Sequence, residues 1–166
     1  MSPARPAAAD VLDALRDRGL TLATAESLTG GLVGAALTAV AGSSDAYRGG
    51  VVCYATDLKA RLAGVPQALL DEHGPVAPET AAALARGVAA VCGADVGAAT
   101  TGVAGPTGQD GHPVGEVYVA VAVAGEEPRV RPLQLSGSRE QIREQSVDAV
   151  LTLLRETVLG LAGRTG

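Results

Sequence analysis

The chain has 166 residues, 47% of them hydrophobic, and a formal net charge of −5 at pH 7. This length and apolar content suit one compact core, so we predict a single domain over residues 1–166 with an ordered part of about 8–160. The acidic balance and the lack of Trp and Phe leave no basic stripe and no stacking platform, so nucleic-acid binding is not expected.

The two cysteines, Cys53 and Cys92, lie in apolar segments and show neither disulfide spacing nor zinc-ligand spacing. We therefore expect two buried thiols, no metal site and a protein of the reducing cytoplasm. The sequence shows no signal peptide and no apolar run long enough to span a membrane. We accordingly expect a soluble, unprocessed protein without a membrane partner.

The first part of the chain predicts a helix, a strand and a second helix. Apolar residues at helical spacing indicate a helix over residues 8–18, which Gly19 is placed to end. Residues 20–25 are typical of a short buried strand, and the Ala- and Leu-rich run 29–40 predicts a helix that stops at Gly42. The strand and the second helix therefore meet in a tight turn.

The middle of the chain repeats this alternation. Residues 50–55 predict a second strand, and a short helix around Lys59 follows it. Pro78 suits the first turn of a helix that runs to about Val91, and residues 95–101 predict a third strand.

The remaining segments predict a loop, a hairpin and a helix. Residues 102–113 carry a glycine at every third position and form a loop, since the run is far too short for a collagen-like helix. Strands over 114–124 and 129–135 are joined by a hairpin turn, and Ser138 caps a last helix. This order predicts an α/β fold, namely one three-layer α/β/α domain with a mixed sheet.

Ser27 and Thr29 lie in the turn between the first strand and the second helix. The free N–H groups of a helix's first turn point toward a bound anion, and Gly30 and Gly31 leave those groups uncovered. We therefore predict that this turn binds a phosphate or an oxyanion beside the Ser27 hydroxyl. The alternative is that Ser27 only caps the helix.

Lys59 is the only lysine among the 13 Lys and Arg residues of the chain. A guanidinium does not give up its proton in a protein, whereas burial lowers the pKa of an amine until it can act as a general base. A single lysine in an arginine-rich chain therefore indicates a base. The alternative is a surface lysine retained by chance.

Other polar residues are weaker candidates for chemistry. Tyr54 ends the predicted second strand just ahead of Lys59, so it either faces the same cleft or is a half-buried strand aromatic. His73 lies in a polar turn and His112 in the glycine loop, and they give little support for a Ser-His-Asp triad.

Arg139 and Arg143 lie four residues apart at the start of the last helix and therefore share one face. Such a pair can grip a phosphate bidentately. The alternative, which the residues alone favour, is a solvated face that includes Glu140 and Glu144.

Several motifs follow one another in a fixed order: Thr-Ala-Glu-Ser-Leu-Thr-Gly-Gly around Ser27, Gly-Ser-Ser, Tyr54 with Lys59, Thr-Gly-Val-Ala-Gly-Pro from Thr101, and Pro-Val-Gly. In this order they resemble the C-terminal domain of CinA, the competence/damage-inducible protein. The resemblance runs from about Val11 to the last helix and implies a CinA C-terminal-like fold.

The resemblance implies a nicotinamide-nucleotide amidohydrolase, which converts nicotinamide mononucleotide to nicotinate mononucleotide and ammonia and feeds NAD synthesis. It implies no metal or organic cofactor, and it implies a homodimer. The family's serine nucleophile is similar to Ser27, its lysine base to Lys59, and its neighbouring catalytic tyrosine to Tyr54. The substrate-binding residues that it implies are Thr29, Gly30, Gly31, Thr101, Gly102, Gly105 and Arg143.

Two assignments stay open at this level. The N–H groups near Gly30 and Gly31 hold either the developing oxyanion or the 5′-phosphate, and in the second case the loop after Thr101 supplies the oxyanion donors. The alternative function is a non-catalytic nucleotide-binding or competence-related interaction module.

The chain also departs from the family's pattern. Thr107 replaces a commonly acidic residue, and Ala77 stands where the family often has a helix-capping serine. The sequence lacks the molybdopterin-binding-like domain of full-length CinA proteins, so we expect either a stand-alone form or part of a longer protein.

Overall fold

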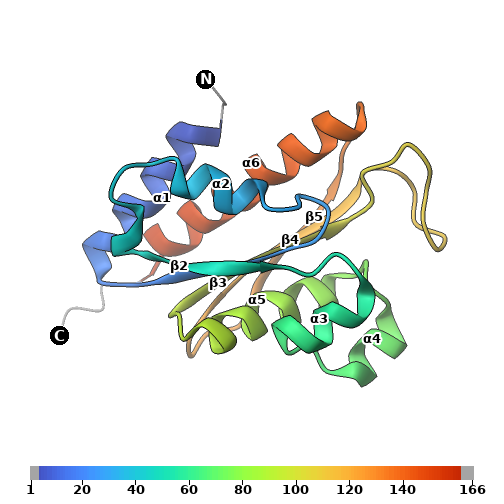
Figure 1. The fold of residues 1–166 in the computed structure, drawn as a ribbon, viewed down its shortest axis with the longest axis horizontal. Coiled ribbons are helices and arrows are strands. Elements are labelled where there is room, and N and C mark those ends of the chain that lie inside the picture. Colours follow the sequence, from blue (N-terminus) through green and yellow to red (C-terminus); the bar gives the residue numbers. More distant parts are fainter. Residues whose placement is uncertain (1–3, 162–166) are drawn as a thin grey trace.

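The computed structural model describes residues 4–161 and shows a five-stranded sheet between two layers of helices (Figure 1). The helices are α1 (Ala4–Arg18), α2 (Leu32–Thr38), η1 (Ser43–Asp45), α3 (Thr56–Ala63), α4 (Gln67–His73), α5 (Pro78–Cys92) and α6 (Arg139–Leu159). The strands are β1 (Leu22–Glu26), β2 (Tyr47–Val52), β3 (Val96–Gly102), β4 (Glu116–Val123) and β5 (Arg129–Gln134). The predicted three-layer α/β/α fold is confirmed. Residues 1–3 and 162–166, which the predicted domain includes, lie outside the described residues.

The sheet is mixed, with strand order β2-β1-β3-β4-β5. Strand β1 pairs in parallel with β2 and with β3, whereas β3, β4 and β5 pair antiparallel. The predicted antiparallel hairpin is therefore confirmed. Because the parallel strands β1, β2 and β3 all end at the same edge of the sheet, the segments that follow them gather there.

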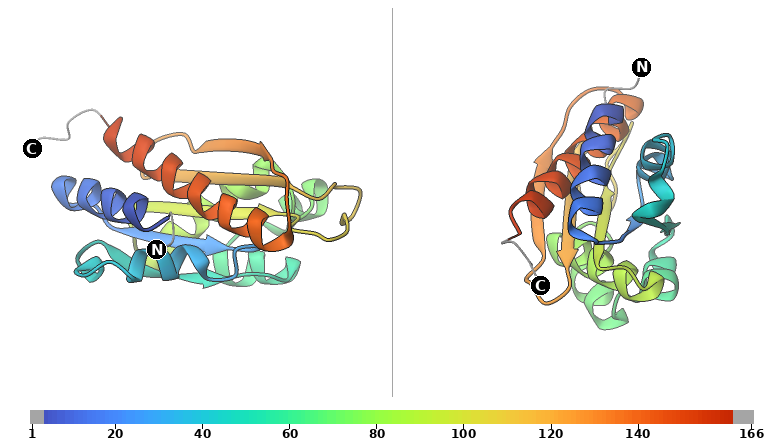
Figure 2. Two further views of the ribbon diagram at one scale, coloured as in Figure 1. Left: turned by 90° about the horizontal axis from the view of Figure 1, so that it is seen from above. Right: turned by 90° about the vertical axis from the view of Figure 1, so that its left-hand side faces the viewer.

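The two faces of the sheet are packed differently. Helices α1, α2 and α6 cover one face, and α3, α4 and α5 cover the other (Figures 1 and 2). Large aliphatic side chains such as Leu12 and Leu154 fill the first face. The sheet residues on the second face are mostly alanines, namely Ala23, Ala25, Ala99, Ala120 and Ala122. Small side chains therefore bring α5 close to the sheet.

Glycines let α5 approach its neighbours at backbone distance. A Cβ atom on Gly97 of β3 would lie 1.9 Å from the carbonyl oxygen of Ala85 in α5. A Cβ atom on Gly87 of α5 would lie 1.7 Å from the carbonyl oxygen of Ala63, the last residue of α3. These two contacts fix α5 against the sheet and fix the end of α3 against α5.

Strand β2 differs from its prediction, since it spans 47–52 rather than 50–55. Gly49 and Gly50 are typical of a turn, yet both lie within the strand. A Cβ on Gly50 would lie 2.3 Å from Thr24 Oγ1, where the Thr24 and Tyr47 hydroxyls hydrogen-bond at 2.7 Å. The glycine is therefore required inside the strand, and Tyr54 follows the strand instead of ending it.

Two helices also differ from expectation. Helix α2 begins at Leu32 rather than at residue 29, because the preceding residues form the turn described below. Helix α4 was not predicted, and His73, expected in a polar turn, is its last residue. The capping predictions are confirmed: Ser138 forms a capping box with Gln141, and Ala77 gives α5 no side-chain cap.

We predict that Gly87→Ala destabilises the protein. At an exposed position in a helix, replacing Gly with Ala stabilises by about 1 kcal/mol. Here the added methyl meets the Ala63 carbonyl, so we expect a net loss of about 1–3 kcal/mol and a lower Tm. Thermal unfolding followed by circular dichroism measures the effect. Ala90→Gly, at an exposed position of the same helix, reports the propensity change alone. A Tm at or above that of the unmodified protein would show that the two helices have room to separate.

Candidate active site

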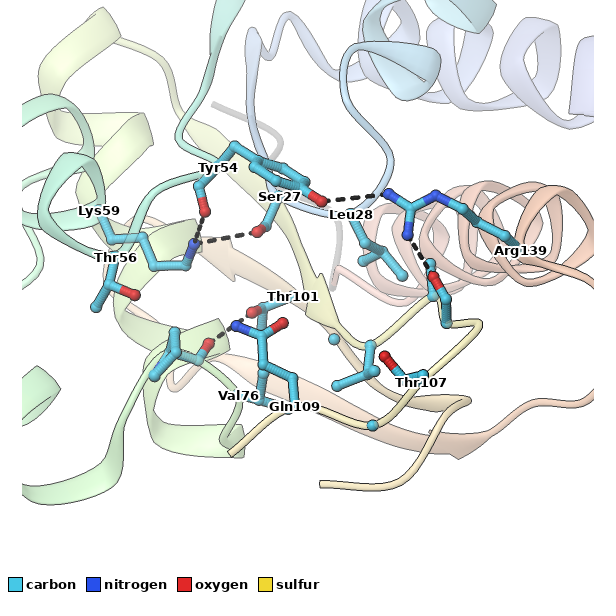
Figure 3. Close-up of a pocket in the computed structure, with 16 residues that line it drawn as sticks. Ser27, Leu28, Tyr54, Thr56, Lys59, Val76, Thr101, Thr107, Gln109 and Arg139 are labelled. Atoms are coloured by element: carbon cyan, nitrogen blue, oxygen red, sulfur yellow. Dashed lines mark hydrogen bonds between the residues drawn. The ribbon is translucent and has the colours of Figure 1, made fainter. Parts of the chain in front are cut away.

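A cavity of about 320 Å³ lies at the carboxyl ends of the parallel strands (Figure 3). Its lining comes from the segments that follow β1, β2 and β3, from the connection between α4 and α5, and from the start of α6. The lining residues are Ser27, Leu28, Tyr54, Thr56, Lys59, Pro75, Val76, Thr101, Gly102, Val103, Ala104, Gly105, Thr107, Gly108, Gln109 and Arg139. The three side chains predicted to be catalytic, Ser27, Lys59 and Tyr54, are among them.

Ser27 and Lys59 are in direct contact. Lys59 Nζ lies 3.0 Å from Ser27 Oγ, although Ser27 follows β1 and Lys59 belongs to α3. The lysine is only 1% exposed and the serine 7% exposed. The structure therefore excludes the alternative of a surface lysine, because Lys59 is fully buried.

The other neighbours of Lys59 set the orientation of its amine. Its Nζ donates to the carbonyl oxygens of Cys53 at 2.8 Å and of Tyr54 at 3.3 Å. A neutral amine has two N–H groups and one lone pair. If the two carbonyls take the N–H groups, the lone pair faces the Ser27 hydroxyl. The geometry therefore fits an amine that accepts the serine proton.

The electrostatics favour the same state. Burial lowers the pKa of Lys59 from its ordinary value of 10.5, and the nearby Cys53 thiol opposes this shift. Among the described residues, Lys59 forms no ion pair with a carboxylate. The pKa of Lys59 is thus closer to physiological pH than the pKa of an exposed lysine. A larger fraction of the amine is therefore neutral.

Glu26, the last residue of β1, organises the turn that carries Ser27. Its buried carboxylate accepts hydrogen bonds from the Thr29 hydroxyl at 2.7 Å and from the N–H of Gly31 at 3.2 Å. It also accepts from the N–H of Val33 at 2.8 Å and of Gly34 at 3.0 Å. The protein's own carboxylate therefore occupies the anion-binding position at the start of α2.

This arrangement changes the expected role of the turn. Thr29 is fully buried and hydrogen-bonds to Glu26 and to the Thr100 hydroxyl, and it does not line the cavity. The N–H of Gly30 donates to the Ser27 carbonyl at 3.1 Å, and that of Gly31 to Glu26. Neither N–H is left for a ligand, so the structure does not bring Thr29, Gly30 or Gly31 to the substrate position.

Tyr54 and Arg139 meet at the rim of the cavity. Tyr54 is 60% exposed, and its hydroxyl accepts a hydrogen bond from Arg139 at 3.2 Å. Arg139 also donates to the carbonyl oxygen of Gly105. Tyr54 is therefore a cavity residue rather than a strand aromatic, and Arg139 connects it to the glycine loop (Figure 3).

Arg143 does not line the cavity. Its guanidinium donates to the carbonyl oxygens of Leu28 at 2.9 Å and of Thr29 at 3.3 Å. Of the two arginines considered from the sequence, Arg139 thus faces the cavity, and Arg143 contacts the outside of the turn that carries Ser27.

The glycine loop supplies one wall of the cavity. Thr101, Gly102 and Gly105 line it as predicted, although the Thr101 hydroxyl donates to the Pro75 carbonyl at 2.6 Å. Within the described part of the chain, the N–H groups of Ala104 and Gly105 have no hydrogen-bond acceptor. These groups are available to bind an anion.

The lining residues that sequence reasoning missed include Leu28, Thr56, Pro75, Val76 and Gln109. Thr56 begins the helix that carries Lys59, so its position next to the base offered a signal. Val76 precedes α5 and reaches the cavity only through the tertiary fold. Gln109 lies inside a loop whose course the sequence does not define.

The two histidines lie outside the lining. His112 contacts the carboxylate of Glu116, and His73 lies near Glu72 and Glu79. Within residues 4–161 there is no cluster of three or more His, Cys, Asp or Glu suited to a metal ion. No helix in that range is long and apolar enough to cross a membrane.

Comparison with known proteins identifies close relatives. The family model of the CinA C-terminal domain matches residues 4–158. A CinA-like protein of Frankia casuarinae is 47% identical over 152 residues, which is 91% of this chain and 35% of that protein. The chain thus spans about a third of the length of the curated relatives that it matches.

Solved structures agree with this result. The competence damage-inducible protein A of Klebsiella pneumoniae is 32% identical with a TM-score of 0.91, covering 96% of this chain and 99% of that one. The competence/damage inducible protein CihA of Agrobacterium tumefaciens is 33% identical with a TM-score of 0.86, covering 91% and 93%. The fold is therefore that of the CinA superfamily.

We predict that Lys59 titrates below 10.5, the ordinary value for lysine. Because it is the only lysine, protein labelled with ¹³C-lysine gives one side-chain signal, which can be followed by NMR as the pH is raised. The same protein in denaturant supplies the ordinary pKa as a control. A folded pKa at or above the control value would contradict the burial argument.

The same shift predicts how stability depends on pH. Between the lowered folded pKa and 10.5, the unfolded chain binds more protons at Lys59 than the folded protein does. The free energy of unfolding should therefore rise with pH across this window, relative to Lys59→Met, which has no titrating amine. Denaturant unfolding of both proteins at matched pH values measures this difference, and a flat or falling difference would contradict the prediction.

Proposed function

We propose that this chain, which belongs to the CinA C-terminal domain family, is an amidohydrolase that converts nicotinamide mononucleotide to nicotinate mononucleotide and ammonia. The observation that supports this proposal most is the 3.0 Å contact between the buried Lys59 amine and Ser27 Oγ. A serine becomes a nucleophile when an adjacent base takes its proton. A depressed lysine pKa provides that base without a histidine.

In the proposed reaction, neutral Lys59 takes the proton of Ser27 as Oγ attacks the carboxamide carbon. The protonated amine then gives this proton to the departing nitrogen, which leaves as ammonia. The acyl-enzyme ester that remains is attacked by water, and Lys59 takes the water's proton and returns it to Ser27 Oγ. The sum is amide plus water to carboxylic acid plus ammonia.

The oxyanion of the tetrahedral intermediate needs N–H donors other than those of Gly30 and Gly31, which are engaged. In the part of the chain that the structure covers, the Leu28 N–H has no acceptor, and Leu28 lines the cavity. The N–H after a nucleophile on a strand-to-helix turn is a common oxyanion donor. We therefore assign this role to the Leu28 N–H, with the loop N–H groups of Ala104 and Gly105 as further donors.

The 5′-phosphate needs a cation that reaches the cavity. Arg139 lines the cavity, whereas Arg143 does not, so Arg139 takes the place that the resemblance suggested for Arg143. The guanidinium of Arg139 already donates hydrogen bonds to two oxygen atoms, Tyr54 Oη and the Gly105 carbonyl oxygen. A phosphate presents oxygens of the same geometry with a full negative charge.

The competing function is a non-catalytic nucleotide-binding or interaction module. Such a module needs neither a buried lysine nor its contact with Ser27, and burying an amine costs free energy. This cost supports the enzyme over the binding module. The homodimer implied by the resemblance stays a prediction.

We predict that Ser27→Ala and Lys59→Arg each abolish ammonia release from nicotinamide mononucleotide. Lys59→Arg replaces the amine with a guanidinium, which stays protonated and cannot act as the base. Ammonia assays on the purified proteins, with circular dichroism to verify folding, test both variants. Near-normal turnover by Lys59→Arg would rule out the Ser-Lys mechanism. No release by the unmodified protein from neutral to alkaline pH would favour the binding module.

We predict that Arg139→Ala weakens use of the nucleotide much more than use of the riboside, which lacks the phosphate. Loss of a charge-assisted hydrogen bond costs about 1.5–3 kcal/mol, roughly ten- to a hundredfold in kcat/KM. Comparing kcat/KM for the two substrates isolates the phosphate contact. Equal losses on both would mean that Arg139 acts only by holding Tyr54 and the loop.

A further inference from the structure

Arg143 links the last helix to the turn of the proposed nucleophile. It lies in the second turn of α6 and donates to the carbonyls of Leu28 and Thr29, more than 110 residues earlier in the chain. Both acceptors are backbone atoms of the residues that directly follow Ser27. The contact therefore acts on the nucleophile's own segment and not on the cavity.

The turn leaves space for this guanidinium. Gly30 adopts a φ of +56°, and a Cβ there would lie 3.3 Å from a terminal nitrogen of Arg143. A side chain at residue 30 would crowd the arginine as well as strain the backbone. The absence of a side chain at Gly30 thus leaves space for Arg143, and not for a ligand as the sequence predicted.

In the turn, a carboxylate binds backbone N–H groups and a guanidinium binds backbone carbonyls. The Glu26 carboxylate accepts from N–H groups of residues 31, 33 and 34, while Arg143 donates to the carbonyls of residues 28 and 29. In a trans peptide the carbonyl and the following N–H point in opposite directions. Fixing the Thr29 carbonyl therefore orients the Gly30 N–H, which donates to the Ser27 carbonyl and so holds the peptide plane that carries the Leu28 N–H.

We propose that Arg143 is a positioning residue: it holds the turn so that Ser27 Oγ meets the Lys59 amine and the Leu28 N–H meets the oxyanion. This inference rests on the proposed function. The planar fork of arginine reaches two carbonyls at once, whereas a lysine ammonium at the same position is a flexible point charge. Arg143 touches no substrate and acts through the backbone of Leu28 and Thr29.

The activity test separates positioning from substrate binding. In Arg143→Ala we expect kcat to fall about a hundredfold, since small displacements of reacting groups have effects of this size. KM should stay within about twofold, and nucleotide and riboside should be affected alike. Arg143→Gln, which retains one donor, and Arg143→Lys should recover part of kcat. Arg155→Ala, which removes an exposed arginine of the same helix paired with Asp10, should leave kcat unchanged.

A second measurement does not depend on activity. The Gly30 N–H donates to the Ser27 carbonyl within the turn. Its hydrogen exchange should become about tenfold faster in Arg143→Ala and in Arg143→Gln, while amides of α5 exchange as in the unmodified protein. If the unmodified protein releases no ammonia, the proposed function fails, and this exchange result still decides whether Arg143 holds the turn.

Unchanged Gly30 exchange in a folded Arg143 variant would overturn the positioning role. A rise in nucleotide KM with constant kcat and no effect on the riboside would overturn it too, in favour of a phosphate contact. If Arg143→Ala does not fold, the same criteria apply to Arg143→Gln and Arg143→Lys.

Discussion

Burial of a single amine is the constraint on which the site depends. Lys59 brings its Nζ to Ser27 Oγ and to the carbonyls of Cys53 and Tyr54, with no carboxylate partner among the described residues. An unpaired ammonium in such a place is costly, so burial lowers the pKa of Lys59 and favours the neutral amine relative to an exposed lysine. The carbonyls after β2, the turn after β1 and the position of α3 must all be correct together. The reactivity proposed for Ser27 therefore depends on the whole fold and not on a local motif.

The turn after β1 is held in place by a carboxylate of the protein itself. In many α/β proteins the N–H groups at such a helix start bind a phosphate. Here the carboxylate of Glu26, the residue directly before Ser27, takes that position. The turn is thus preorganised without a ligand. The groups proposed for anion binding are the Leu28 N–H of this turn and, from other segments of the cavity lining, the loop N–H groups and Arg139.

Local patterns were sufficient for the order of most elements and for the choice of Ser27 and Lys59. They were insufficient wherever a contact joins distant segments. A glutamate that ends a strand gives no sign that its carboxylate turns back onto the next helix, so the N–H groups of Gly30 and Gly31 were assigned to a ligand. Arg139 and Arg143 share one helical face, so their spacing in the sequence does not distinguish their contacts. In the folded chain Arg139 lines the cavity, whereas Arg143 donates to the carbonyls of residues 28 and 29. Helix α4 has only seven residues, too few for a clear apolar stripe.

The backbone contacts of α5 also mean that the two sides of the sheet tolerate substitutions to different degrees. On the α1, α2 and α6 side, Leu, Ile and Val side chains fill the space between layers, and cores of this kind accept exchanges that conserve volume. On the α5 side, Gly87 and Gly97 each lie directly against a backbone carbonyl. The side chain of glycine is a single hydrogen atom, so any substitution there adds volume for which there is no space. Selection for thermostable variants should therefore yield substitutions in the first layer and leave Gly87 and Gly97 unchanged. The layer that carries Lys59 is thus held in place by two positions at which no side chain fits.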